Sequence, residues 1–150
     1  MDKGEKVDKI ISSFHEVNKF FYKQMWHLAN ELGVTVSQLQ ILKLISQEPN
    51  LGLHELTKKM KINKSAVSST VDRLVKASYL KREQSQTDRR AIILNLTELG
   101  EEKEREGQKL FRERLRHLNT IRDEDIEILL ELHQLVKEKI KENGDERIER

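Results

Sequence analysis

The fold of this chain is decided by two segments, NKSAVSSTVDRLV at residues 63–75 and DRRAIILNLTELG at residues 88–100. In the first segment apolar side chains recur at steps of three and four, which predicts an amphipathic helix. In the second the period falls to two, because Ile92, Leu94 and Leu96 alternate with their neighbours. That alternation predicts a β-strand. The chain therefore passes from a helix into a short β-hairpin between these segments.

The residues before position 63 extend the first segment into a pair of helices. A short helix is expected from Leu53 to Met60, and after a turn at Lys61 and Ile62 a second begins at Asn63 or Lys64 and runs to about Ala77. Two short helices joined by a turn of about three residues form a helix-turn-helix. The buried face of the second helix is expected to hold Ala66, Val67, Thr70, Val71, Leu74 and Val75.

The hairpin that follows is predicted to be a wing. Its strands are expected at 79–84 and 91–96, and the connecting residues 85–90 are all polar. A polar tip between two strands has no role in a core, so it is expected to project from the domain.

Longer helices flank this central lobe. Apolar residues at helical spacing predict a helix from Lys6 to Leu32 that ends at Gly33. Thr35 and Gln38 form a capping box for the next helix, which Pro49, Asn50 and Gly52 end. Two more helices are expected at 98–118, capped by Thr97, and at 123–142, and residues from Asn143 onward are expected to fray.

Positive charge is concentrated in the lobe. Residues 52–96 hold 10 basic and 4 acidic side chains, whereas the rest of the chain holds 18 basic and 22 acidic ones. A basic middle between acidic ends indicates a surface for a polyanion such as nucleic acid, although a chance cluster on a solvated face gives the same count.

Several other function classes are disfavoured. The chain has no cysteine, and its five histidines are scattered without the spacing of a metal site, so neither a metal nor a cofactor is expected. No nucleophile–base spacing or glycine-rich phosphate loop suggests an enzyme. No apolar run reaches the ~20 residues of a membrane span, and residues 1–9 lack a signal peptide's apolar segment, so we expect a cytoplasmic protein with no membrane partner.

These motifs together resemble the MarR family of winged helix-turn-helix transcriptional regulators. The resemblance rests on TVSQLQIL at residues 35–42, on residues 63–75, and on the wing signature Asp-x-Arg followed by Leu-Thr-x-x-Gly at residues 88–100. It implies one MarR-type domain over residues 1–150, with 35–100 as the DNA-binding lobe and 1–33 and 101–145 as dimerisation helices. Ser69 is a departure, since many relatives carry arginine there, and the pattern of base readout can differ accordingly.

The residues expected to touch duplex DNA lie on the second helix of the pair and on the wing. Small hydroxyl side chains let a helix approach base edges closely, and arginines read guanine or enter a narrow minor groove. The resemblance implies that Arg90 enters the minor groove and that Asp88 orients the wing by pairing with a nearby arginine. A solvated helix face and a solubilising turn are the alternatives. The candidates are Asn63, Lys64, Ser65, Ser68, Ser69, Arg73, Asp88, Arg89 and Arg90.

A homodimer is expected because the first and the last two helices carry more apolar surface than the lobe can bury. Its two-fold symmetry predicts a pseudo-palindromic operator, although intramolecular burial of the first helix remains an alternative. By resemblance, a small phenolic or hydrophobic effector would bind near Phe20, Tyr22 and Trp26 and relieve repression, unless these aromatics only pack. The second reading of function is a winged-helix interaction protein that pairs with another regulator without binding DNA.

Overall fold

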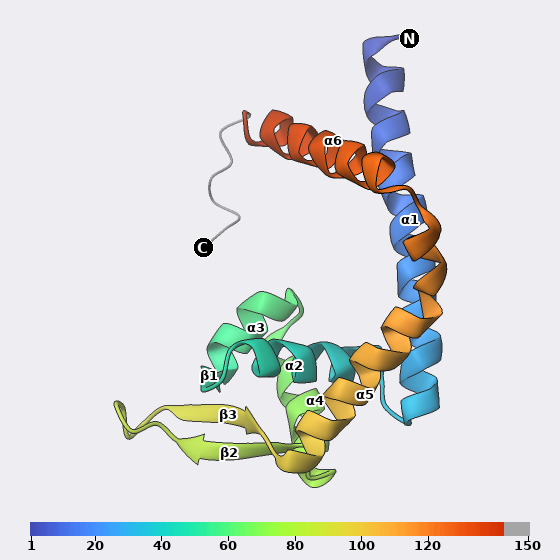
Figure 1. Ribbon diagram of the computed structural model, residues 1–150. Coiled ribbons are helices and arrows are strands. Elements are labelled where there is room, and N and C mark those ends of the chain that lie inside the picture. The colour runs from blue at the N-terminus through green and yellow to red at the C-terminus, as the bar shows by residue number, and fades with distance from the viewer. Residues whose placement is uncertain (143–150) are drawn as a thin grey trace. The chain divides into compact units, whose positions relative to one another are not determined.

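The computed structural model describes residues 1–142, in two compact units that begin at Met1 and at Arg114. The predicted fraying from Asn143 onward, and the last residues of the 101–145 dimerisation segment, lie outside the described residues. Each unit is taken by itself below, with the elements labelled as in Figure 1.

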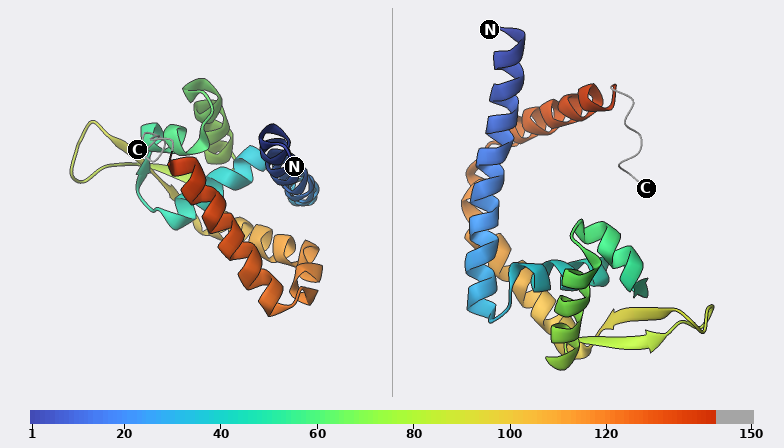
Figure 2. Two further views of the ribbon diagram at one scale, coloured as in Figure 1. Left: turned by 90° about the horizontal axis from the view of Figure 1, so that it is seen from above. Right: turned by 180° about the vertical axis from the view of Figure 1, so that it is seen from behind.

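The first unit holds the predicted helix-turn-helix and hairpin. The mainly helical fold class with a small sheet is confirmed. Within this unit the hairpin projects beyond the helices of the lobe, as both views in Figure 2 show. The elements are α1 (Lys3–Leu32), α2 (Val36–Gln47), β1 (Leu51–Gly52), α3 (Leu53–Met60), α4 (Lys64–Lys76), β2 (Leu80–Gln84), β3 (Ile92–Leu96) and α5 (Glu98–Arg114).

Local signals set most helix ends where the sequence predicts them. Thr35 accepts a hydrogen bond from the Gln38 backbone N–H at 3.1 Å, and the Gln38 side chain accepts one from the Thr35 N–H at 2.8 Å, which completes the capping box. Gly33 ends α1 with a φ of 69°, a left-handed conformation that glycine adopts without strain. The start of α1 lies earlier than predicted, at Lys3, because Asp2 supplies an N-cap.

The hairpin belongs to a three-stranded antiparallel sheet of order β1-β3-β2. Strand β1 is an addition to the prediction: Leu51 pairs with Leu94 and Gly52 with Ile93. Two residues are too few to show a period of two, and Asn50 and Gly52 carry turn signals. The Asn50 backbone N–H donates to the Asn95 side-chain oxygen at 2.8 Å, and the Asn95 side-chain amide donates back to Asn50 at 2.8 Å.

Two apolar clusters hold the first unit together. Helix α2 contributes to both, so it links the lobe to α1 and α5. One cluster lies under the helix pair and the sheet and contains Ile41, Leu42, Ile45, Leu51, Leu56, Val67, Val71, Leu74, Leu80 and Leu94. The other joins the end of α1 to α2 and contains Leu28, Ala29, Leu32, Val36 and Leu39, with Leu110 and Phe111 of α5 against it.

The N-terminal part of α1 carries a stripe of exposed apolar side chains. In Figure 1 this part runs away from the helices of the lobe. The exposed stripe contains Val7, Ile10, Ile11, Val17 and Phe21. Among residues 1–142, the helices fall short of the combined length and apolarity that a bilayer crossing requires.

The second unit contains a 3₁₀ turn, η1 (Arg116–Thr120), and α6 (Asp123–Lys141). The predicted helix over 98–118 is therefore too long, because α5 ends at Arg114. Asn119, Thr120 and Ile121 are poor helix formers, and 3₁₀ turns are frequent at such ends. Arg122 pairs with Asp125 through two hydrogen bonds of 2.8 and 2.9 Å, and this contact raises the pKa of Arg122. Exposed apolar residues on α6 include Ile128, Leu129, Leu132 and Leu135.

Candidate nucleic-acid interface

Helix α4 presents a polar face opposite its buried one. Val67, Val71 and Leu74 are at most 1% exposed and anchor the helix to the lobe core. Of the remaining residues predicted to be buried, Ala66, Thr70 and Val75 are half-buried. The outward face carries the predicted contact residues Lys64, Ser65, Ser69 and Arg73, all exposed, and Ser68, half-buried beside them.

Asn63 occupies a different place from the other α4 candidates. It is the N-cap of the helix, and its side-chain oxygen accepts from the Ala66 backbone N–H at 2.7 Å. One face of its amide is therefore committed to holding the helix start. Its side-chain NH₂ group is the part that can face a ligand. Lys64 follows at the first helical position, where the positive end of the helix dipole adds to its charge.

The wing tip is shaped by its own side chains. Ser85 N–H donates to the Ala91 carbonyl at 2.9 Å, and the Ala91 N–H donates to the Asp88 carbonyl at 3.1 Å. The Gln84 side-chain amide donates to the Arg89 carbonyl. These bonds hold the backbone around Arg89 and Arg90, whose exposed guanidinium groups make no ion pair within residues 1–142.

Asp88 makes a contact that the family resemblance does not imply. Its carboxylate accepts from the backbone N–H of Arg90 at 3.0 Å. The resemblance implies pairing with an arginine side chain, and no such ion pair occurs for Asp88 in the described part of the chain. In this structure Asp88 fixes the turn that presents Arg90, which orients the wing by a backbone bond.

An ion pair joins the helix to the wing. Asp72, on the outward side of α4, pairs with Arg82 of β2. Lys81 and Arg82 are neighbours on β2, the strand that leads into the wing, and both are exposed. Both are paired here, since Lys81 lies 3.1 Å from Glu83. The Asp72–Arg82 pair ties α4 to the first wing strand, so the two groups of candidate contact residues are positioned together.

The basic residues between positions 52 and 96 are all exposed. Lys59 pairs with Glu48 at 2.7 Å, and Lys81 and Arg82 are paired as described. The others make no ion pair among residues 1–142 and are available to phosphates. They are Lys58, Lys61, Lys64, Arg73, Lys76, Arg89 and Arg90.

The predicted effector residues lie on α1. Tyr22 and Trp26 border a hollow of about 300 Å³ together with Val34 and the start of α2. Phe20 does not line this hollow and is 62% exposed. The rings of Trp26 and His27 are nearly perpendicular in a T-shaped arrangement, with centroids 5.2 Å apart. Two of the three aromatics thus border one hollow of a size that a small ring system could enter.

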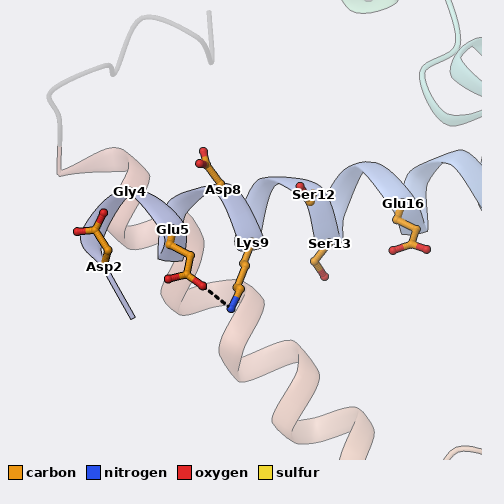
Figure 3. Close-up of a pocket in the computed structure, with 8 residues that line it drawn as sticks. All are labelled: Asp2, Gly4, Glu5, Asp8, Lys9, Ser12, Ser13 and Glu16. Carbon is orange, nitrogen blue, oxygen red and sulfur yellow. Dashed lines mark ion pairs between the residues drawn. The ribbon is translucent and has the colours of Figure 1, made fainter.

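A hollow at the N-terminal end of α1 is not an enclosed site. It measures about 590 Å³ and runs along the polar N-terminal face of α1. Figure 3 shows that its side chains come from that helix alone, with an ion pair between Glu5 and Lys9, so no second element encloses it. Within residues 1–142 no group of three histidine or acidic side chains is placed to hold a metal ion.

Comparisons with known proteins agree with this geometry. Residues 34–92 match the sequence profile of the MarR family. The regulator TcaR of Staphylococcus aureus is 26% identical over 130 residues, which is 85% of each chain. The repressor MdtR of Bacillus subtilis is 32% identical over 78 residues, covering 52% of this chain and 50% of MdtR. A crystal structure of a cysteine-to-serine mutant of MarR from E. coli, complexed with operator DNA, has a TM-score of 0.72 at 20% identity and covers 91% of this chain and 99% of that one.

Proposed function

This chain belongs to the MarR family, and we propose that it is a sequence-specific, duplex DNA-binding transcriptional regulator that acts as a homodimeric repressor. One observation carries the proposal: the outward face of α4 and the free arginines of the wing belong to one unit, joined by the Asp72–Arg82 ion pair. The helix face suits a major groove, and the wing tip suits the adjacent minor groove.

In the proposed complex each contact residue has a separate role. Ser65, Ser68 and Ser69 allow close approach to base edges, and Arg73 takes a guanine edge or a phosphate. Lys64 binds phosphate at the helix start. Arg90 enters the minor groove, and Arg89 lies beside it along the backbone. Asn63 and Asp88 hold the helix and the turn that present these groups.

The homodimer rests on the uncovered apolar surfaces of the flanking helices. The stripe on α1 and the apolar residues of α6 would each form a surface patch larger than monomers usually expose. In the proposed dimer, residues 1–33 and 101–145 pair about a two-fold axis, and the lobes at 35–100 face neighbouring turns of DNA. The protein acts in the cytoplasm, where bacterial operators are found.

The proposal is tested by selecting duplexes from a random pool with the purified protein. We expect an inverted repeat whose half-site centres lie about 34 Å apart, one turn of DNA. Raising the salt concentration should weaken binding steeply, with a log–log slope of roughly −0.9 for each phosphate contacted. A single unrepeated site, or a monomer at the concentrations used, would contradict the dimeric arrangement.

The second candidate is an interaction protein that pairs with another regulator and leaves DNA to its partner. The uncovered α1 stripe is the observation that favours it. Salt separates the two functions, because a complex held by apolar helices changes little with salt, whereas phosphate contacts are lost. We assign no catalytic reaction to the chain.

Relief of repression by a small molecule is the regulatory part of the proposal. The hollow beside Tyr22 and Trp26 supports it, since it lies next to α2, which reaches into the lobe. A ligand that binds more tightly to another position of the lobe lowers the affinity for the operator. The size of the effect is set by the ratio of the ligand's affinities for the two positions. Titration of small phenols against the protein–operator complex measures this, and unchanged affinity throughout would remove the phenolic effector from the proposal.

A further inference from the structure

Glu104 is the one charged side chain that is buried among residues 1–142, with 6% of its surface exposed. It lies on α5, within a run of charged residues whose other acids are exposed. Its carboxylate accepts one hydrogen bond, from the Gln108 side-chain amide at 2.5 Å. That amide is neutral, so the Glu104 carboxylate has no cationic partner among residues 1–142. Buried charges are normally paired with an opposite charge.

Neither the adjacent Lys103 nor the cations that share a hollow with Glu104 pair with it. Lys103 lies 3.9 Å from Glu106 and donates to the Leu32 carbonyl. Lys81, which borders a wider hollow on one side of Glu104, is paired with Glu83 at 3.1 Å. Arg105 shares that wider hollow and Lys43 borders a smaller one, yet neither forms an ion pair with Glu104 among the described residues.

The smaller hollow gives Glu104 an apolar setting. It measures about 80 Å³ and lies between α1, α2 and α5, all within the first unit. Its apolar lining comes from Met25, Leu28, Leu39 and Phe111. Gly107, on the same face of α5, has no side chain to fill it, and a Cβ there would lie 3.3 Å from Leu39. One buried carboxylate in an apolar hollow is complementary to a cation with an apolar stem.

We propose that this hollow binds a small organic cation, with an ammonium or amidinium head on Glu104 and an apolar stem against Leu28, Leu39 and Phe111. The site is separate from the hollow at Tyr22 and Trp26. The volume admits a cationic head with a short stem, and larger ligands would leave the rest of their body outside. Such a ligand is opposite in charge to an acidic phenol. Any effect of the cation on operator binding rests on the function proposed above.

Helix α2 couples a ligand in this hollow to the DNA-binding surface. Leu39 borders the hollow, whereas Ile41, Leu42 and Ile45 of the same helix belong to the core under α4. A cation between α2 and α5 therefore changes the support of the lobe. We expect the cation to bind more tightly when α2 is displaced from its position in the operator-bound protein. It then weakens operator binding by the same factor.

The ligand class is tested on the full-length protein without DNA. Phenylbutylammonium is titrated against phenylbutanol, a neutral molecule of similar shape, and the fluorescence of Trp26 is followed. Trp26 is the only tryptophan and is adjacent to Met25 in the chain, which makes it a local reporter. We expect the ammonium to bind about tenfold more tightly or better, as a charged hydrogen bond to a buried group provides. Equal affinities would overturn the proposal.

Two variants assign the preference to Glu104. Glu104→Gln keeps the size and removes the charge, so the ammonium should lose its advantage while phenylbutanol binds as before. Glu102→Gln makes the same charge change at an exposed position of α5 and should keep the advantage. A preference that survives in Glu104→Gln would overturn the site. The site would also be overturned if Glu104→Gln weakened dimerisation and the wild type showed no preference for the ammonium. A cation of the partner subunit would then occupy the hollow.

Operator binding is measured separately, so that the two proposals can fail independently. Without ligand, Glu104→Gln should bind duplex DNA as the wild type does, since Glu104 lies outside the candidate interface. Ammonium binding by a protein that ignores every duplex would overturn the regulatory role and the proposed function, but leave the cation site standing. Duplex binding without any ammonium preference would overturn the site alone.

Discussion

Gly100 lies directly against the backbone of Tyr79, so close that a Cβ added at residue 100 would fall 2.0 Å from the Tyr79 carbonyl oxygen. The same carbonyl accepts from the Thr97 N–H at 3.1 Å. The Thr97 hydroxyl donates to the Ser78 carbonyl at 2.5 Å and accepts from the Gly100 N–H at 3.0 Å. Thr97 and Gly100 of the Leu-Thr-x-x-Gly signature therefore hold the start of α5 against the turn between α4 and β2.

Gly100→Ala should destabilise the protein strongly, because the added methyl group meets backbone atoms that cannot rotate away. We expect the free energy of unfolding to fall by about 3 kcal/mol, as severe overpacking does. Chemical denaturation followed by circular dichroism measures it. The control is Gly107→Ala on the same helix, where the nearest atom is a flexible leucine methyl. Equal stability of the two variants would contradict the close approach.

Ser78→Gly should stabilise the protein. Ser78 follows α4 with a φ of 64°, a left-handed conformation that costs a side-chain-bearing residue free energy. Its N–H donates to the Val75 carbonyl, and the Tyr79 N–H donates to the Leu74 carbonyl, as at helix ends that usually carry glycine. We expect a gain of about 1 kcal/mol in the free energy of unfolding. Ser78→Ala, which keeps a Cβ, should show no such gain.

Sequence patterns predicted the elements whose signals are local and repeated. Val67, Val71 and Leu74 fix the buried face of α4, and the Asn63 cap fixes its start, so both could be predicted without tertiary information. The polar tip between two alternating strands predicted the wing for the same reason. The contact residues share one face and one hairpin, and their roles toward DNA remain predictions.

The features that sequence patterns missed depend on packing between distant segments. Strand β1 exists because β3 offers it an edge, and its two residues carry no period of their own. Glu104 lies in a charged run, and the hollow beside it is formed by α1 and α2, which are distant in the chain. The Asn50–Asn95 contact joins residues 45 positions apart in the chain, a pairing that no local pattern encodes.

Arg90→Ala should weaken operator binding by about 1–3 kcal/mol if its guanidinium enters a groove. The side chain is exposed and has no ion-pair partner within residues 1–142, so its loss should leave the free energy of unfolding unchanged. Fluorescence anisotropy with a labelled operator measures the affinity. Arg112→Ala removes an equal charge from an exposed position of α5 and serves as the control. Equal losses in both variants would mean that only net charge matters.

Asp88→Ala and Asp88→Asn should affect operator binding differently, although each removes the same charge. Asp88 holds the backbone N–H of Arg90 at 3.0 Å, and the asparagine oxygen can accept the same bond. Loss of one negative charge near phosphates favours binding in both variants. Loss of the turn bond occurs only in the alanine variant.

We therefore expect Asp88→Ala to bind the operator about 1 kcal/mol more weakly than Asp88→Asn, which is the contribution of one hydrogen bond. Affinities measured by anisotropy at two salt concentrations separate the charge effect, which shrinks with salt, from the ordering of the turn, which does not. If the two variants bound alike and both more tightly than the wild type, Asp88 would act on the DNA only through its charge, and the turn that presents Arg90 would not need it.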